Sequence, residues 1–172
     1  MTKEEIELKY QEFKNTPSDI NEHLETLRGY ADHCESVTEF GVRGCVSLFA
    51  FLASNAKKVV AVDILNVWVP DVPKLTFINA DDLTIEIEET DFLFIDSYHT
   101  GSHLKKELDL HSGKVNKYIG FHDTGFFGIT GEDGQPGLMV AINEFLSNHP
   151  EWRIIYSTDK NNGLTIMQRI SN

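Results

Sequence analysis

The sequence predicts an α/β fold built around a mostly parallel sheet. Short apolar segments of strand length alternate along the chain with amphipathic segments of helix length, as in repeated strand–helix–strand units. The turn after the first strand contains two glycines, and the second strand ends on an aspartate. The turn signal Asn161-Asn162-Gly163 joins the last two strands as a hairpin and makes the final strand antiparallel.

Each element has a local justification. The segment 2–14 is a charged amphipathic helix, and a second helix starts at about Ser18, a suitable N-cap after Pro17. Further helices are expected near 45–54, 101–111 and 136–148, the last with Pro136 in its first turn. The expected strands are the apolar runs 37–40, 58–62, 75–79, 91–95, 116–121, 152–157 and 163–169.

The composition is typical of one globular domain, residues 1–172, with N-terminal helices over 1–34 and a sheet core over 36–169. A formal net charge of −12 repels phosphate backbones, so no nucleic-acid partner is expected. Neither a membrane-length apolar run nor a signal peptide is recognised, and the cytoplasm is the expected location. The two cysteines form no disulfide framework or zinc pattern.

The first strand, its turn and the second strand predict a nucleoside-binding pocket. Gly41 and Gly44 let a ligand approach backbone that a Cβ would shield, and Asp63 ends the second strand, where an acid can accept from ribose hydroxyls. Dinucleotide sites usually carry three glycines, whereas this turn has two. Glu39 would repel a diphosphate and attract a sulfonium, which favours S-adenosylmethionine. The alternative is an ordinary turn with a capping acid.

This stretch resembles motif I of the class I S-adenosylmethionine-dependent methyltransferases, with Asp63 at the family's ribose-binding acid. The resemblance covers residues 36 to about 169 and implies a Rossmann-like seven-stranded sheet. Its strand order would be 3-2-1-4-5-7-6, with the last strand antiparallel and helices on both faces. Asp81 falls where the superfamily often has an acid that accepts from the adenine amino group; its alternative role is a helix cap.

A second group of polar residues ends the fourth and fifth strands. Asp96 and His99 follow one strand, and His122 and Asp123 follow its neighbour on the same edge of the sheet. These side chains could converge and hold a hard divalent cation such as Mg²⁺. The alternative is that they only cap strand and helix ends. His103 and His111, on the helix that follows, are expected on its solvated face, and Asp82 is expected to be solvated.

The pattern Asp-x-x-His followed by an acid pair is similar to the sugar and macrolide O-methyltransferases and the cephalosporin-hydroxylase-like proteins. This resemblance implies Asp96 and Asp123 as metal ligands and His99 as the base. The chain departs at His122, where that group often has glutamate. An imidazole ligand would favour Mn²⁺, Fe²⁺ or Zn²⁺ over Mg²⁺, or the change could mean that no metal binds. Asp96 is expected to contact the cofactor as well.

These observations together lead to the hypothesis of a methyltransferase that uses S-adenosylmethionine, with Mg²⁺ or Mn²⁺ assisting. The resemblance implies O-methylation of a small hydroxylated acceptor, such as a sugar or a secondary metabolite. Two alternatives stay open: a cofactor-binding or scaffold protein without turnover, and a metal-dependent hydroxylase-like enzyme. The sequence names neither the acceptor nor the oligomeric state, and a homo-oligomer stays open.

Overall fold

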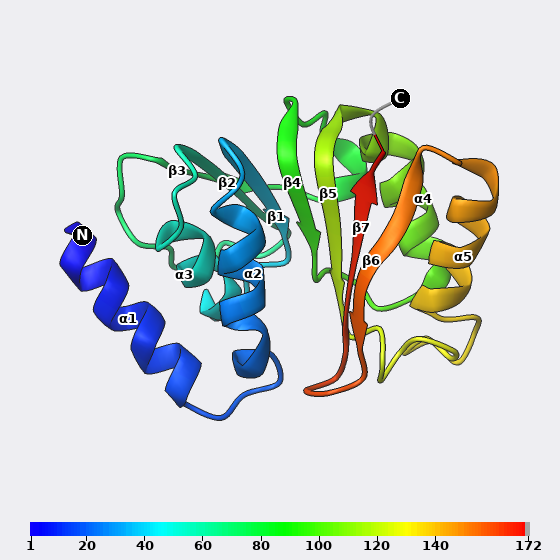
Figure 1. Cartoon of the computed structure of the whole chain (residues 1–172), viewed down its shortest axis with the longest axis horizontal. Helices are drawn as coiled ribbons and strands as arrows, with labels where there is room; N and C mark the ends of the chain where they lie inside the picture. The colour runs from blue at the N-terminus through cyan, green and yellow to red at the C-terminus, as the bar shows by residue number, and fades with distance from the viewer. Residues whose placement is uncertain (171–172) are drawn as a thin grey trace.

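A computed structural model describes residues 1–170 of the chain, and its centre is a seven-stranded sheet (Figure 1). The strand order is β3-β2-β1-β4-β5-β7-β6, and β7 runs opposite to the other six strands, which confirms the order implied by the resemblance. The strands are β1 (Ser36–Phe40), β2 (Lys58–Asp63), β3 (Leu75–Asn79), β4 (Thr90–Ile95), β5 (Val115–His122), β6 (Trp152–Thr158) and β7 (Leu164–Arg169).

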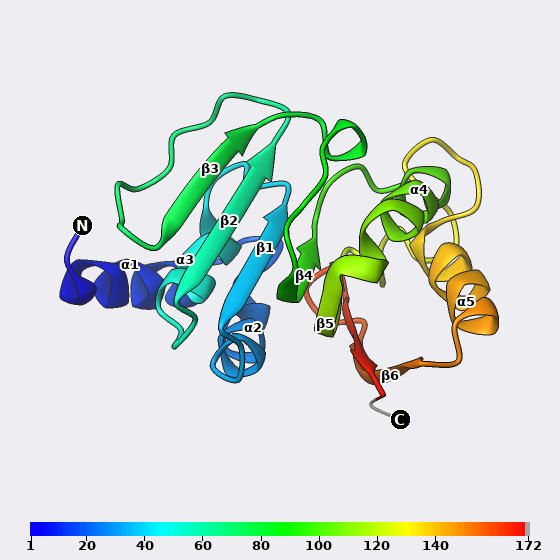
Figure 2. The same cartoon turned by 90° about the horizontal axis from the view of Figure 1, so that it is seen from above.

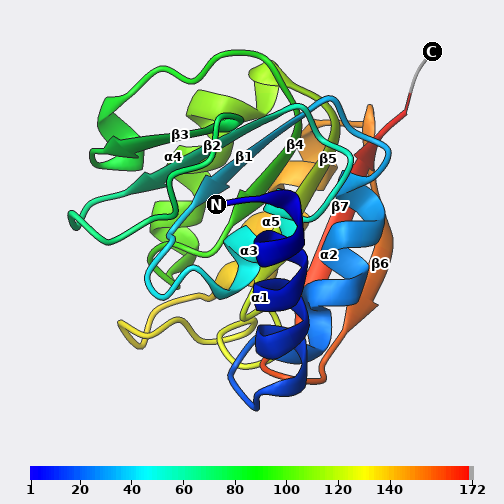
Figure 3. The ribbon, with the colours of Figure 1, turned by 90° about the vertical axis from the view of Figure 1, so that its left-hand side faces the viewer.

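Helices cover both faces of the sheet, as expected (Figures 2 and 3). The helices are α1 (Lys3–Asn15), α2 (Leu24–Ala31) and α3 (Val46–Leu52) on one face, and α4 (Gly101–His111) and α5 (Leu138–Asn148) on the other. Each face has its own apolar core. Phe49 and Phe51 of α3 are fully buried in the first, and Leu104 and Ile142 are buried in the second. Neither helix layer contains a helix that is both long and apolar enough to cross a membrane, among the residues described.

Two helix starts differ from the sequence-based expectation. The Ser18 hydroxyl accepts from the backbone of Asn21 at 3.0 Å and begins a short 3₁₀ turn, η1 (Asn21–His23), before α2. Helix α5 begins at Leu138, so the placement of Pro136 in its first turn is wrong. The Pro136 carbonyl instead accepts from the backbone of Gly101 at 3.0 Å and thereby fixes the start of α4.

The sheet brings the predicted polar residues to one edge. The carboxyl ends of four parallel strands are in register, because Phe40 pairs with Val62 and Ile95, and Ile95 pairs with Phe121. The chain order reverses between β1 and β4, and ligands of open α/β sheets bind outside the carboxyl ends at such a point.

Candidate active site

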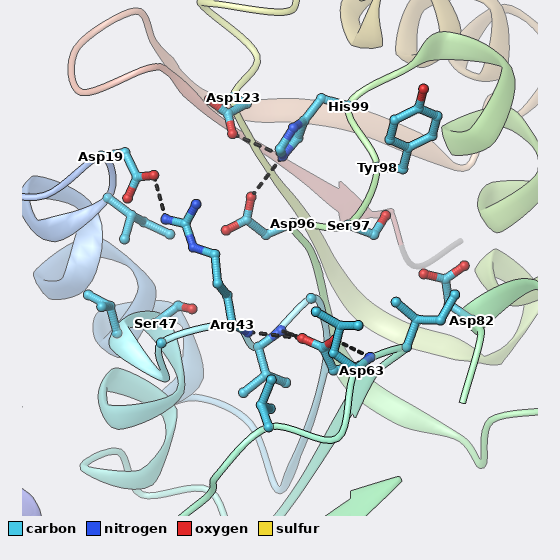
Figure 4. Close-up of a pocket in the computed structure, with 18 of the residues that line it drawn as sticks. Asp19, Arg43, Ser47, Asp63, Asp82, Asp96, Ser97, Tyr98, His99 and Asp123 are labelled. Carbon is cyan, nitrogen blue, oxygen red and sulfur yellow. Dashed lines mark hydrogen bonds and ion pairs between the residues drawn. The ribbon is translucent and has the colours of Figure 1, made fainter. Parts of the chain in front are cut away.

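A cavity of about 560 Å³ lies at this edge of the sheet (Figure 4). The volume falls within the range of about 300–1,000 Å³ that is usual for small-molecule sites. Seven of the nine residues that the sequence predicts for the site line this cavity: Gly41, Gly44, Asp63, Asp81, Asp96, His99 and Asp123. The other two, Glu39 and His122, do not line it.

The two glycines of the turn differ in how strongly the fold requires a residue without a Cβ. Gly41 has a φ of +81°, and a Cβ there would lie 2.0 Å from the carbonyl oxygen of Asp96, so the fold itself requires glycine. At Gly44 a Cβ would meet only the side chain of Val46, at 4.0 Å. The turn also holds Arg43 and Cys45 at positive φ, a strain that is common at ligand sites.

Asp63 organises the turn as well as lining the cavity. One carboxylate oxygen accepts from the backbone N–H groups of Val42 and Arg43, both at 2.9 Å, and the other accepts from Leu65 at 2.8 Å. A carboxylate offers about four acceptor positions, so Asp63 keeps capacity for a ligand hydroxyl. The capping alternative and the ribose-binding role are therefore compatible in this geometry.

Asp81 combines its two expected roles in a similar way. Its side chain caps the 3₁₀ turn η2 (Asp82–Thr84) by accepting from the backbone of Leu83 at 2.9 Å. It also lines the cavity, beyond the end of β3. One carboxylate oxygen caps the turn, and the other can accept from a ligand.

The role predicted for Glu39 does not match its place in the structure. Its side chain is fully buried and accepts a hydrogen bond from the Ser47 hydroxyl. Burial, together with the charges of Asp96 and Asp63, raises the pKa of Glu39 well above its usual value despite that bond. Glu39 is fully buried and does not line the cavity, so it does not meet a ligand sulfonium in the way the sequence suggested. Glu39 positions Ser47, which lines the cavity.

Two carboxylates and two imidazoles meet at the other end of the cavity. Asp96 Oδ1 lies 3.4 Å from His99 Nε2 and 3.1 Å from His122 Nδ1. Asp123 Oδ2 lies 3.0 Å and 3.3 Å from the same two nitrogens. Burial opposes ionisation of Asp96, but the bonds from both histidines hold its pKa below the usual value.

His122 is a buried cation in this group. Its Nδ1 faces the two carboxylates, and its Nε2 faces the carbonyl oxygens of Asp19 and Asn161 at 3.0 and 3.3 Å. Burial lowers its pKa, but the bonds to Asp123 and Asp96 outweigh burial and raise the pKa to about 10. Both nitrogens face acceptor atoms, an arrangement that favours a ring protonated at both. His122 is not among the three residues whose donor atoms form a possible ligand set here, Asp96, His99 and Asp123, and its role as a metal ligand stays a prediction.

His99 lies on the cavity wall between two carboxylates and an aromatic ring. It stacks on Phe127, with ring centroids 5.1 Å apart, and its Nδ1 lies 3.5 Å from Glu132 Oε1. Burial lowers the pKa of His99, but the bond to Asp96 and the charges of Asp123, Asp96 and Glu132 together raise it. His99 is therefore protonated more readily than a free histidine.

The donor atoms at this end fit a divalent cation. Asp96, His99 and Asp123 each offer one ligand atom within 4.8 Å of the others. Asp123 Oδ1 is buried and has no hydrogen-bond partner among residues 1–170. Two carboxylates with an open acceptor position are ligands that a hard cation prefers. Asp96 and Asp123 supply the carboxylates of this set, and His99 lies beside them.

Several lining residues were not singled out by the sequence analysis. Arg43 and Asp19 form an ion pair at 2.5 Å that joins the glycine turn to the segment before α2 (Figure 4). Ser97 and Tyr98 also line the cavity, and their place directly after Asp96 is a signal that could have found them. The pairing with Asp19 has no comparable signal, because it depends on tertiary packing.

The histidines of α4 are not solvated as expected. His111 is buried, and its Nε2 contacts the carbonyl oxygen of Asp82 at 2.8 Å. His103 is half-buried, with Nε2 at 3.1 Å from Asp82 Oδ1. For His111 the signal was present in the spacing, because it follows the buried residues Leu104 and Leu108 by seven and three positions.

The comparisons with known proteins agree with this architecture. No protein-family model matches the chain, and no curated protein matches its sequence. Among solved structures, a putative caffeoyl-CoA O-methyltransferase from Staphylococcus aureus matches with a TM-score of 0.67 and 14% identity, over 95% of this chain and 91% of that one. The S-adenosylhomocysteine-bound methyltransferase PaMTH1 from Podospora anserina matches with a TM-score of 0.61 and 15% identity, over 96% and 88%.

A third match is the MycE methyltransferase of the mycinamycin pathway, in complex with Mg, S-adenosylhomocysteine and mycinamycin VI. It has a TM-score of 0.61 and 16% identity, over 88% of this chain and 49% of that one. At these identities the likeness establishes the fold. The chain has the fold of the class I methyltransferases and resembles O-methyltransferases among them.

Proposed function

We propose that the protein transfers a methyl group from S-adenosylmethionine to an oxygen atom of a small hydroxylated acceptor. The observation that carries this proposal is that one cavity joins two kinds of group. A glycine turn with Asp63 and Asp81 lies at one end, and His99 lies between two carboxylates at the other. The fold likeness to O-methyltransferases supports the same reaction class.

The first end of the cavity suits an adenosyl group. Asp63 can accept from ribose hydroxyls, and Asp81 can accept from an amino group of the base. The exposed apolar side chains of Ile64 and Leu65 line the same region and suit the face of a purine.

At the second end of the cavity, the carboxylates of Asp96 and Asp123 contact one buried imidazole ring, His122. The residual negative charge there favours a cationic ligand group.

S-adenosylmethionine, when bound, supplies a methyl group on a sulfonium sulfur, which is already a good electrophile. The protein has to align the acceptor hydroxyl and remove its proton. His99 lines the cavity beside Asp96 and Asp123, and in our proposal its neutral ring takes that proton. The carboxylates stabilise the resulting imidazolium. Placement supplies most of the acceleration, and a positioned base adds about 10²–10⁴-fold.

Asp96 and Asp123 would hold a divalent cation, with His99 nearby. Such an ion would lower the pKa of an acceptor hydroxyl and fix its direction. The presence of Mg in the MycE complex supports this part of the proposal for the fold.

The function is tested by binding and by product formation. We expect S-adenosylhomocysteine to bind and to raise the melting temperature by mass action, and NAD to leave it unchanged. With a panel of sugars and phenols, S-adenosylmethionine should yield methylated product and S-adenosylhomocysteine in equal amounts. Stabilisation by NAD alone would contradict the proposal. Binding without any product would favour the scaffold alternative, and an oxidised product would favour the hydroxylase-like one.

The glycine turn offers a matched pair of variants. Gly44→Ala meets no backbone atom, so we expect the melting temperature of the free protein to stay close to that of the wild type. Its affinity for S-adenosylhomocysteine should nevertheless fall, because the added methyl group occupies space beside the ligand. Gly41→Ala has to move the backbone after β4 and should lose both stability and affinity. Calorimetric titration and thermal unfolding measure the two effects. Unchanged affinity in Gly44→Ala would place the ligand elsewhere.

The proposed role of a divalent cation is tested with a variant of Asp123. We expect Asp123→Asn to abolish stimulation of turnover by Mg²⁺ or Mn²⁺, because it removes charge from the buried carboxylate with the unpartnered oxygen. S-adenosylhomocysteine affinity should change by only a few-fold. The exposed carboxylate of Asp109 provides the control Asp109→Asn, which should respond to the metal as the wild type does. Wild-type turnover that is indifferent to EDTA would remove the metal from the reaction.

A further inference from the structure

A second cluster of potential metal ligands lies apart from the group around His99. It consists of Asp82 in η2 and of His103 and Glu107 in α4, four residues apart on one face of that helix. Figure 4 shows Asp82 on the side of the cavity away from Asp123. Neither the proposed reaction nor the sequence analysis assigns a function to these three residues together.

The spacing of the donor atoms suits a small divalent ion. His103 Nε2 lies 3.1 Å from Asp82 Oδ1 and 3.7 Å from Glu107 Oε1, and the three ligand atoms lie within 4.8 Å of one another. Metal–ligand bonds of about 2.1 Å in a tetrahedron separate neighbouring donors by roughly 3.4 Å. Two of the distances bracket this value before any ion has drawn the side chains together.

An independent observation points to a missing ligand. Glu107 is fully buried, and its Oε1 accepts from the Ser97 hydroxyl at 2.6 Å, while its Oε2 has no hydrogen-bond partner among residues 1–170. A buried carboxyl oxygen without a partner costs free energy. A cation that the Glu107 carboxyl group binds through Oε2 would supply the missing partner.

We propose that Asp82, His103 and Glu107 form a binding site for one divalent transition-metal ion, of which Zn²⁺ is the best match. One imidazole and two carboxylates suit Zn²⁺ or Mn²⁺, whereas Mg²⁺ prefers six oxygen ligands. Ser97 holds the Glu107 carboxyl group in place, as outer-shell partners of metal ligands do. Asp82 and His103 both line the cavity, so a further ligand to the ion would come from that side.

The ion would connect two elements that shape the cavity. Asp82 follows Asp81, the cap of η2, and the Asp82 carbonyl oxygen already accepts from His111 of α4. Metal ligation would tie the side chain of Asp82 to the same helix. We therefore expect Zn²⁺ to raise the melting temperature, because it binds the folded chain and the three ligands are brought together only by folding.

The test separates this site from the group around His99. Chelator-treated Asp123→Asn protein, which lacks a carboxylate of that group, is titrated with Zn²⁺ alone by calorimetry and thermal unfolding. We expect one ion per chain and a raised melting temperature. Adding His103→Ala or Glu107→Gln should weaken Zn²⁺ binding at least about 100-fold, the upper end of what loss of an outer-shell partner costs.

A control variant and a second measurement distinguish loss of metal binding from misfolding. His149 pairs with Glu151 at 3.2 Å on the surface, so His149→Ala removes a histidine–carboxylate pair elsewhere and should leave binding unchanged. Glu107→Gln keeps the shape of the side chain and removes a buried acid, so the metal-free variant should unfold at or above the parent's temperature. Parent protein without Zn²⁺ binding, or Glu107→Gln and His103→Ala variants that bind as the parent does, would overturn the proposal. None of these measurements depends on methyl transfer.

Discussion

Asp63→Ala is expected to lose most of the affinity for S-adenosylhomocysteine. The ligand hydroxyls would lose a charged acceptor, which typically costs about 1–3 kcal/mol, or roughly 5–150-fold in affinity. The backbone N–H groups of Val42, Arg43 and Leu65 would lose their acceptor too. The turn that presents Gly44 would loosen, so the total effect should lie at the upper end of that range. Calorimetric titration of wild type and variant measures it.

Two further variants separate the direct effect from the effect on the turn. Asp63→Asn keeps one acceptor oxygen for the turn but removes the charge, so its affinity should fall between those of the wild type and Asp63→Ala. The loop after β2 also contains the exposed Asp71, and Asp71→Ala should bind as the wild type does. Wild-type affinity in Asp63→Ala would refute both the ribose-binding role and the proposed position of the adenosyl group.

The sequence predicts the sheet well because its signals are local. The apolar run 58–62 and the terminal Asp63 identify a strand end without reference to the rest of the chain. The Asn161-Asn162-Gly163 turn identifies the hairpin, and all three residues have positive φ in the structure. Asp96, His99 and Asp123 could be grouped in advance because parallel strands carry their carboxyl ends to a common edge.

The rest depends on contacts between segments distant in sequence. Nothing near His122 in sequence reveals that its Nε2 faces the carbonyl oxygens of Asp19 and Asn161. These residues lie 103 and 39 positions away. Glu39 appeared to be charged because its burial against α3 depends on helix packing. Protonation states and ligand sets follow from tertiary surroundings, so pattern reasoning reaches the residue but not its charge.

His99→Ala is expected to lower turnover by about 10²–10⁴-fold, the range for loss of a general base. Affinity for S-adenosylhomocysteine should change little, because His99 contacts Asp96, Asp123, Glu132 and Phe127 and lies away from the glycine turn. The exposed His33 provides the control His33→Ala, which should turn over as the wild type does. Single-turnover kinetics with the metal saturating isolates the chemical step from product release.

The pH dependence of the rate provides a second test of His99 as the base. His99 acts as a base only when its ring is neutral, and the neighbouring carboxylates raise its pKa above the ordinary value. The wild-type rate should therefore increase with pH, and the midpoint should lie above about 6.5, the value for a free histidine. His99→Ala should lack this increase. A variant that keeps more than about a tenth of wild-type turnover would lie outside the range for a lost base. His99 would then serve only to hold Glu132 and Phe127 beside the cavity, and the acceptor would lose its proton to Asp123 or to water.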